Sequence, residues 1–223
     1  DSIRERSVMS LYKYLGSEDN LLSVAPTFHG AIRIKSPVLS PREVLKLYGY
    51  DNWFKHKKII CHYRTTGNLE SKIKRIKKEA ENALLDGAKI IFLSDEGLRK
   101  GLLPIPMPLV VSSLHHYLVE KKMRSKVSII CITGDACEDH HLAVLIALGA
   151  SAVYPYMAYE LIREYFDEDD WSIKMHNYRY ALEKGLLKIM SKMGISTISS
   201  YCGSMLLHSI GLGPKISKKF FPS

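Results

Sequence analysis

The sequence has no long apolar run: no stretch approaches the about 18 apolar residues of a membrane-spanning helix, so no membrane partner is expected. The N-terminal segment, DSIRERSVMSLYKYLG, is charged and lacks the apolar core of a signal peptide. The chain also begins with Asp1 instead of Met, and we therefore expect it to be a piece of a longer chain.

Cysteine is scarce as well. The four residues, Cys61, Cys131, Cys137 and Cys202, are too few and too scattered for a disulfide scaffold. Cys61 and Cys131 lie in apolar, strand-like runs, which favours buried, reduced thiols in a cytoplasmic protein. An iron–sulfur cluster needs at least a third thiolate near Cys131 and Cys137, and the local sequence has none. We expect Cys131 to lie in the core.

Acidic residues are fewer than basic ones: the sequence has 23 Asp and Glu and 32 Lys and Arg, which gives a net charge of +9. A basic protein suggests a nucleic-acid partner. A cluster of lysines, however, belongs to one predicted helix at 69–85, where Ile73, Ile76, Ala80 and Leu84 recur at helical spacing. That pattern is typical of a solvated face over an apolar stripe. The sequence has no zinc-finger spacing to support such a partner, so we expect no nucleic-acid partner.

The composition is that of a globular protein. The chain has 223 residues, of which 46% are hydrophobic and 25% are charged, enough for one large domain or one domain with arms. We expect an N-terminal arm or linker over 1–40, a single domain over 41–213 and a polar, mobile tail over 214–223.

Strands and helices alternate along the domain. Apolar runs predict strands at 58–63, 89–94, 127–133 and 152–154. Amphipathic segments between them predict helices at 69–85, 107–121 and 139–148. Apolar strands separated by helices of about ten or more residues indicate a parallel sheet with right-handed helical crossovers. The predicted fold class is therefore α/β.

Further helices flank this unit. One is predicted at 42–48, with Ser40 as its N-cap, Pro41 at its first position and Glu43 three residues after the cap. Another follows residue 154 and runs through Glu160. The C-terminal third predicts an acidic turn at 167–170, a long helix at 172–193 interrupted by Gly185, an extended piece at 195–200 and a last helix at 201–210.

Two adjacent histidine pairs occur, His115-His116 and His140-His141. Neighbouring helical residues point about 100° apart, so neither pair binds one metal from one face. Neither pair is completed into an H-E-x-x-H array. We expect one buried, hydrogen-bonded histidine and one surface histidine in each pair, and no metal site.

Asp95 and Asp135 each follow a predicted strand and therefore lie along the same edge of the sheet. Two such carboxylates suit acid–base catalysis. No His, Lys or Ser nucleophile array joins them in the sequence, so we expect the helix-capping and turn-forming role instead, and no catalytic residue.

The turn Gly134-Asp135-Ala136 is the strongest local pattern, because it joins a strand to a helix that a glycine–alanine pair closes. Flavin barrels use this arrangement to bind phosphate with the backbone N–H groups at the helix start. Here Glu138 and Asp139 occupy that start, where carboxylates favour the helix dipole themselves and repel a phosphate. The turn therefore resembles a phosphate site that has lost its phosphate, and no bound cofactor is expected.

Many segments match one known family in order along nearly the whole chain. They are 2–22, SPVLS at 36–40, DGAKIIFLSD at 86–95, 104–108, VSSLHHYL at 111–118, 134–158 and 210–212. The string KGLLKIMSKMGISTISSY at 184–201 is the most specific. Together they resemble the central domain of the large (alpha) subunit of glutamate synthase, dependent on NADPH or ferredoxin. Cys137 and Cys202 depart from the pattern, since that family has arginine there.

This resemblance implies a degenerate FMN barrel, that is, a partial TIM-barrel-like fold. It implies a parent enzyme that makes two glutamates from glutamine and 2-oxoglutarate, in the cytoplasm or in the plastid stroma. An amidotransferase domain releases ammonia, and an FMN barrel with an iron–sulfur cluster reduces the iminoglutarate. Those two domains are the implied partners, while the central domain holds no cofactor and is inactive alone.

The resemblance also implies that the central domain helps to wall the ammonia path. Such a wall must be packed and weakly polar, so that ammonia is kept from water and protonation. The segment that offers these side chains is Met190, Ser191, Lys192, Met193, Gly194, Ile195, Ser196 and Thr197. Two alternatives stay open: an independent flavin- or phosphate-binding domain that uses the Gly134 turn, and a stand-alone adaptor that kept the fold.

Overall fold

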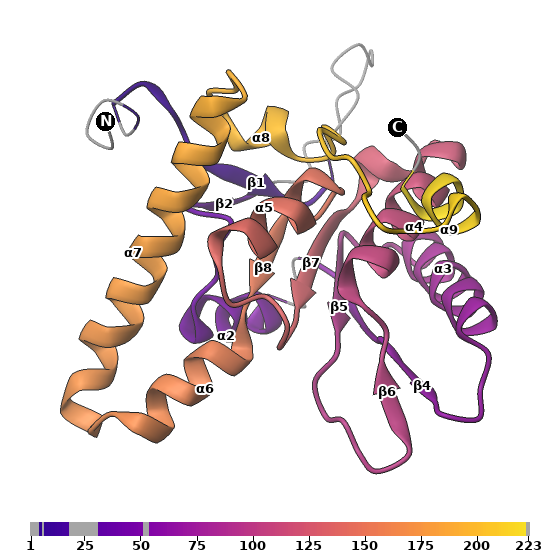
Figure 1. Ribbon diagram of the computed structural model, residues 1–223, viewed down its shortest axis with the longest axis horizontal. Helices are drawn as coiled ribbons and strands as arrows, with labels where there is room; N and C mark the ends of the chain where they lie inside the picture. The colour runs from indigo at the N-terminus through magenta and orange to yellow at the C-terminus, as the bar shows by residue number, and fades with distance from the viewer. Residues whose placement is uncertain (1–4, 6, 18–30, 51–53, 222–223) are drawn as a thin grey trace.

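A parallel four-stranded sheet forms the centre of the computed structural model, which describes residues 5, 7–17, 31–50 and 54–221 (Figure 1). Its strands are β3 (His56–Ile60), β5 (Ile90–Ser94), β7 (Ser128–Ile132) and β8 (Ala152–Tyr154), in that order. Each strand pairs with the next one in the order, and helices make the connections, which confirms the predicted α/β class. Within the described residues this sheet is an open, partial barrel-like arrangement.

The sheet is covered on both faces, because successive residues of a strand point to opposite sides. Ile91 and Ile129 pack in a cluster that includes residues of α3 (Leu69–Leu85), α4 (Met107–Glu120) and α5 (Asp139–Ala147). Phe92 and Ile130 pack in a second cluster with residues of α2 (Pro41–Gly49) and α6 (Tyr156–Tyr165). Every residue of β5 and β7 is buried, as expected of parallel strands between two helical layers.

The described part of the predicted arm packs closely on the domain. Strands β1 (Lys13–Leu15) and β2 (Ile32–Ile34) form an antiparallel pair whose Leu15 and Ile34 are buried. Farther along, the Leu39 N–H donates to the Val153 carbonyl over 2.9 Å, and the Val153 N–H donates to Pro37 over 2.8 Å. Residues 37–39 therefore extend the main sheet beside β8.

The helix starts follow the sequence closely. Ser40 caps α2 in a complete capping box: its hydroxyl accepts from the Glu43 N–H, and the Glu43 carboxylate accepts from the Ser40 N–H over 2.9 Å. Pro41 is the first residue of α2, as predicted. Helix α3 covers the predicted 69–85 and buries Ile73, Ile76 and Ala80. Lys74 and Lys78 are exposed, as expected of a solvated face, whereas Lys72 and Lys77 are half-buried.

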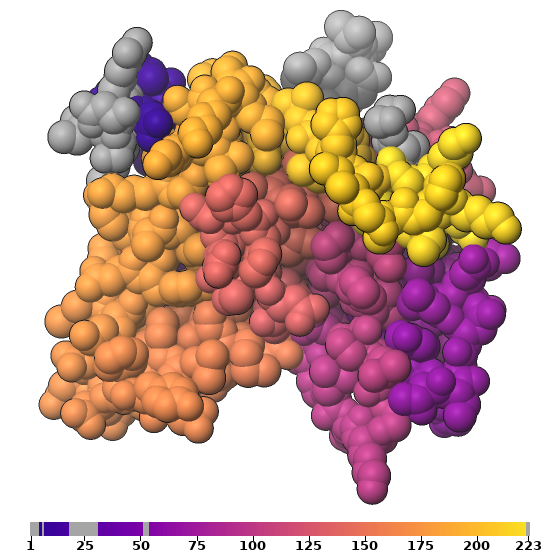
Figure 2. Space-filling view, in the orientation of Figure 1, coloured from indigo at the N-terminus to yellow at the C-terminus, as the bar shows by residue number. Residues whose placement is uncertain are grey.

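The strand predicted at 58–63 is divided at Cys61. Residues after the division form β4 (His62–Arg64), which pairs antiparallel with β6 (Leu102–Pro104) in a separate sheet. The cause lies in the hydrogen bonds of Cys61, whose N–H donates to Ser94 while its carbonyl accepts from Ile105. At this residue the hydrogen-bond partner of the chain thus changes from β5 to the strand β6. The loop that leads into β6 projects from the body of the molecule (Figure 2).

The helix predicted at 172–193 is longer than expected and has no interruption. Helix α7 (Glu168–Lys192) includes the predicted acidic turn as its first turn, where carboxylates suit the helix dipole. The helix continues through Gly185 without a break. This glycine lies against Asp139 of α5, where a Cβ would be 2.0 Å from the Asp139 Oδ2. Close packing between α5 and α7 therefore explains why residue 185 is a glycine. No helix among the described residues is long and apolar enough to cross a membrane.

The two elements predicted directly after α7 were wrong. The extended piece expected at 195–200 contains α8 (Ile198–Tyr201), and the helix expected at 201–210 does not form. Backbone bonds to α5 compete with that helix, because Gly203 donates to Ile146 over 3.0 Å and Met205 donates to Ala147 over 3.1 Å. The segment for which we expected a mobile tail contains α9 (Pro214–Phe220), whose Phe220 is buried.

Candidate functional site

The carboxyl edge of the sheet, where barrel enzymes keep their chemistry, is organised around Asp95. This residue follows β5 and is only 3% exposed. Its carboxylate accepts hydrogen bonds from the Thr133 hydroxyl and, over 3.0 Å, from the Gly134 N–H, both beyond the end of β7. Its backbone carbonyl accepts from His62 Nε2 over 2.6 Å. Asp95 thus ties together three chain segments that end at this edge.

Burial raises the pKa of Asp95, although the hydrogen bonds from Thr133, Gly134 and Tyr156 act in the opposite direction. The pKa of Tyr156 is raised by burial and by the neighbouring Asp95 carboxylate, so its hydroxyl stays a neutral donor. All these groups satisfy one another. The edge therefore presents a closed hydrogen-bonded cluster.

The role that the sequence suggests for Asp135 is not the one observed. The N-cap of α5 is Glu138, which makes no side-chain capping bond, so Asp135 does not cap this helix. Its N–H donates to the Thr133 hydroxyl over 3.3 Å, and its side chain is exposed. Asp95, expected to form a turn, instead holds the turn of the neighbouring strand. In the described part of the chain, no hydrogen bond joins the two carboxylates.

The Gly134 turn does not have the chemistry that a flavin phosphate requires. Two of its N–H groups, on Gly134 and Asp135, already donate to Asp95 and Thr133. Beside it lies a cavity of about 300 Å³, lined mainly by apolar side chains such as Met107 and Leu145. Asp135 lines this cavity, and the described residues bring no Lys or Arg to it. These residues do not fit the phosphate of a bound flavin.

Neither histidine pair forms a metal site. His115 and His116 are both half-buried, whereas His140 and His141 are both exposed, so the expected division into one buried and one surface residue is wrong for each pair. Burial and the nearby Arg124 lower the pKa of His115 to about 4, and the neutral ring accepts from Arg124 Nε over 3.1 Å. Among the described residues, no group of three His, Cys, Asp or Glu is placed to hold a metal.

The four thiols are divided by exposure. Cys61 and Cys131 are fully buried, as expected, and burial raises the pKa of Cys61 to about 12. Cys137 is exposed and Cys202 is half-buried. All four are free thiols.

The segment predicted to wall an ammonia path, Met190 to Thr197, lies at the corner between α7 and α8. Only Met190 is buried, while Met193 is 41% exposed at the end of α7. The corner is joined to the N-terminal arm: the Ser10 N–H donates to the Ser196 carbonyl over 2.8 Å, and the Ile198 N–H donates to Ser10 over 2.9 Å. Most of the segment thus lies on the surface of this chain.

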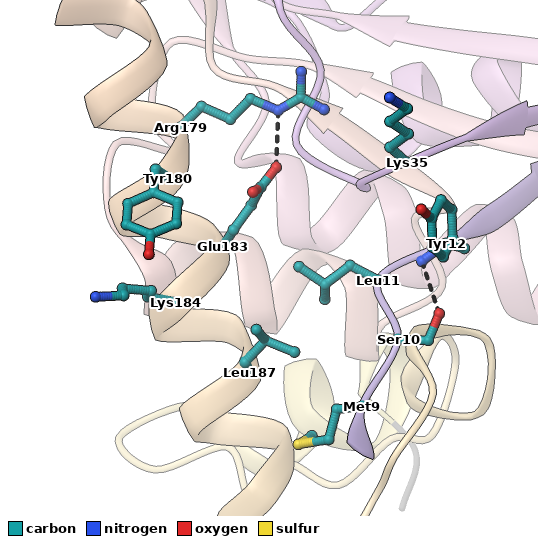
Figure 3. Close-up of a pocket in the computed structure, with 10 residues that line it drawn as sticks. All are labelled: Met9, Ser10, Leu11, Tyr12, Lys35, Arg179, Tyr180, Glu183, Lys184 and Leu187. Carbon is teal, nitrogen blue, oxygen red and sulfur yellow. Dashed lines mark hydrogen bonds and ion pairs between the residues drawn. The ribbon is translucent and has the colours of Figure 1, made fainter. Parts of the chain in front are cut away.

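Next to this corner, a cavity of about 470 Å³ separates the arm from α7 (Figure 3). Leu11 of the arm and Leu187 of α7 point toward one another across it, and Met9 lies at one end. Arg179, at the other end, donates to Glu183 over 2.9 Å. The sequence did not reveal this cavity, because its two walls are far apart in the chain and neither carries a motif.

A family model described as "Glutamate synthase central domain" matches residues 1–213 of the chain. The glutamate synthase (NADPH) large chain of Bacillus subtilis is 36% identical over 227 residues, which cover 99% of this chain and 15% of that protein. The glutamate synthase (NADH) of Schizosaccharomyces pombe is 34% identical over 235 residues, covering 99% of this chain and 11% of that protein. The chain therefore spans 11–15% of the length of these two relatives.

Among solved structures, a mutant flavocytochrome b2 with benzoylformate is similar in fold. The TM-score is 0.50 at 14% sequence identity, and the match covers 83% of this chain and 45% of that one. At this identity the likeness concerns the fold alone, and it agrees with the partial barrel-like sheet.

Proposed function

Because this chain belongs to the glutamate synthase central domain family, we propose that it serves as the central, non-catalytic part of a glutamate synthase. In this proposal the whole enzyme makes glutamate from glutamine and 2-oxoglutarate, in the cytoplasm or in the plastid stroma. The chain connects an amidotransferase domain to an FMN-binding domain of the parent chain. FMN and the iron–sulfur cluster belong to that other part of the enzyme.

One observation carries the non-catalytic role: the Asp95 carboxylate occupies the Gly134 N–H that a phosphate would use. The buried Asp95 carboxyl group thus fills this place with acceptor oxygens of the protein itself. A flavin phosphate would meet like charge from Asp95 and Asp135, and like charges at close range disfavour binding. The proposal therefore assigns the carboxyl edge a structural role.

The connecting and walling role is supported by the α7–α8 corner. Met193 and Ser196 are exposed on this chain, so they are available to face another domain. The adjoining cavity has the apolar side chains of Met9, Leu11 and Leu187 at the end near the corner, whereas its charged residues Arg179 and Glu183 lie at the other end. In the proposal, a second domain completes the wall that this corner begins.

Bulky substitutions in the full enzyme test this role. Met193→Trp or Ser196→Trp should reduce glutamine-dependent glutamate formation, while activity with added ammonia stays near normal, because only the first needs internal transfer. Met157→Trp is a matched control, since Met157 of α6 is 43% exposed and Met193 is 41% exposed. An equal fall of both activities would remove the support for the walling role. A yellow chromophore on the purified chain would contradict the cofactor-free role.

A further inference from the structure

A different cavity lies at the opposite, amino edge of the sheet, where β7 begins and just before β8. Its volume is about 360 Å³. Lys13, His115 and Arg124 line it, together with four serines: Ser125, Ser128, Ser151 and Ser199. Among the described residues, no Asp or Glu contributes to its wall. We call this cavity the basic pocket.

Lys13 is the unusual member of the basic pocket. It takes an inward-facing position of β1, two residues before the buried Leu15, and only 9% of its surface is exposed. Within the part of the chain that the structure describes, its ammonium has neither a hydrogen-bond acceptor nor an ion-pair partner. The alkyl stem of Lys13 is therefore buried while its ammonium keeps contact with solvent, since this nitrogen is not among the buried polar atoms without a partner in the described part of the chain. The pocket thus contains a cation placed to meet an anion.

Arg124 adds a second positive charge that is held in a fixed position. Its Nη1 donates to the Val127 carbonyl and its Nη2 to the Gly149 carbonyl, each over 2.7 Å. Its Nε donates to His115 Nδ1 over 3.1 Å. Since Nδ1 accepts, the neutral His115 ring carries its proton on Nε2, where it is a donor.

Hydroxyl groups complete the wall. Ser151 is 3% exposed, and its oxygen accepts from the Ile129 N–H over 3.2 Å, which leaves its O–H to donate. Ser128 is used differently: its oxygen accepts from the Gly16 N–H over 3.0 Å and holds the arm over the pocket. Ammonium, guanidinium and hydroxyl donors together are the groups that recognise phosphate and carboxylate oxygens.

We propose that the basic pocket binds a small oxyanion, a phosphate or carboxylate group, with the Lys13 ammonium as its counter-charge. The volume suits a small molecule, since ligand pockets measure about 300–1,000 Å³. The inference is independent of the proposed function, because it concerns the opposite edge of the sheet from Asp95 and a different cavity from that of Figure 3. Two separate probes, one with a phosphate group and one with carboxylate groups, identify which oxyanion binds.

The test uses isothermal titration calorimetry on the full-length protein, at fixed ionic strength, with inorganic phosphate and, separately, with succinate. Lys13→Met removes the charge and keeps a side chain of similar length. It should weaken binding about ten- to hundredfold, because a hydrogen bond to a charged group is among the strong ones. Lys74→Met removes the same charge from the exposed face of α3 and should leave binding unchanged. Ser151→Ala is a second variant in the pocket, expected to weaken binding about threefold or more.

Saturable binding of either probe that both pocket variants weaken supports the proposal, and the probe that binds names the oxyanion. If Lys13→Met fails to fold, as judged by its melting curve without ligand, Ser151→Ala decides alone. The proposal is overturned if the unaltered protein binds neither probe saturably. It is equally overturned if the pocket variants bind as tightly as Lys74→Met. These binding results do not test the transfer of ammonia, which is tested by comparing glutamine-dependent and ammonia-dependent activities.

Discussion

The carboxylate of Asp95 accepts a hydrogen bond from the N–H of Gly134, 3.0 Å away on the neighbouring strand's turn. This bond places the buried Asp95 carboxyl group at the backbone N–H of the turn whose sequence resembles a phosphate site. The same carboxylate also accepts from Thr133. The turn that a sequence comparison would take for a ligand site is therefore held by the protein's own side chain.

Removal of this side chain should destabilise the fold. Asp95→Ala leaves the Thr133 hydroxyl and the Gly134 N–H without their acceptor in a buried place, which costs about 2–4 kcal/mol in the free energy of unfolding. Urea unfolding measures the change. Asp135→Ala is the control: its side chain is exposed, so its effect should stay within about 0.5 kcal/mol. Equal stability of the two variants would contradict the role assigned to Asp95.

His115 should make stability depend on pH. Its folded-state pKa of about 4 lies below the ordinary 6.5, so the unfolded chain takes up this proton first as the pH falls. The free energy of unfolding should therefore decrease from about pH 6.5 toward pH 4, by about 2 kcal/mol after allowance for the part of the ring near solvent. Urea unfolding over this range is the measurement.

The variant His115→Gln removes the titrating ring and keeps an acceptor for Arg124. It should flatten this part of the stability curve, whereas His140→Gln, at an exposed position, should not. A curve for His115→Gln with the same slope as that of the unaltered protein would show that other groups cause the dependence.

Gly185→Ala should destabilise the protein although alanine is the better helix former. The added Cβ would lie 2.0 Å from the Asp139 Oδ2 and 2.4 Å from its Cβ, so α5 and α7 must move apart. Overpacking of this kind costs about 1–3 kcal/mol. Gly49→Ala, at a helix position with nothing within 4 Å, should be neutral or slightly stabilising. Thermal melting of both variants makes the comparison, and an unchanged Gly185→Ala would refute the close packing.

Alkylation should separate the four thiols. Iodoacetamide reacts with the thiolate, so the exposed Cys137 should be modified first and the half-buried Cys202 more slowly. Cys61, whose pKa is raised to about 12, and the fully buried Cys131 should react only after denaturation. Mass spectrometry of peptides after timed quenching gives the order. Early modification of Cys131 in the folded protein would contradict its place in the core.

The sequence predicted those elements whose local pattern agrees with their packing. Helix α3 has an apolar stripe, an Asn68 cap and a clear stop, and the prediction of 69–85 matched it. The strand at 58–63 was predicted as one element because apolar composition continues through Cys61, whereas its hydrogen-bond partner changes there. Periodicity carries no information about such an exchange of partners.

In the candidate sites too, the features set by neighbouring residues in the chain were predictable, and those set by tertiary contacts were not. The Gly134 turn was recognisable from its neighbours in the chain, but its partner Asp95 comes from another strand, and only the fold brings them together. Lys13 was not singled out, since a lysine between two tyrosines is ordinary in sequence. Its significance comes from the strand face that it occupies.

The two hydrogen bonds of Ser10, to Ser196 and from Ile198, have a mechanical consequence. They run from one residue of the arm to both sides of the same corner, so a sliding of the arm by one residue breaks both at once. Displacing the arm at Ser10 therefore requires either that the corner at Ser196 and Ile198 moves with it or that both bonds break.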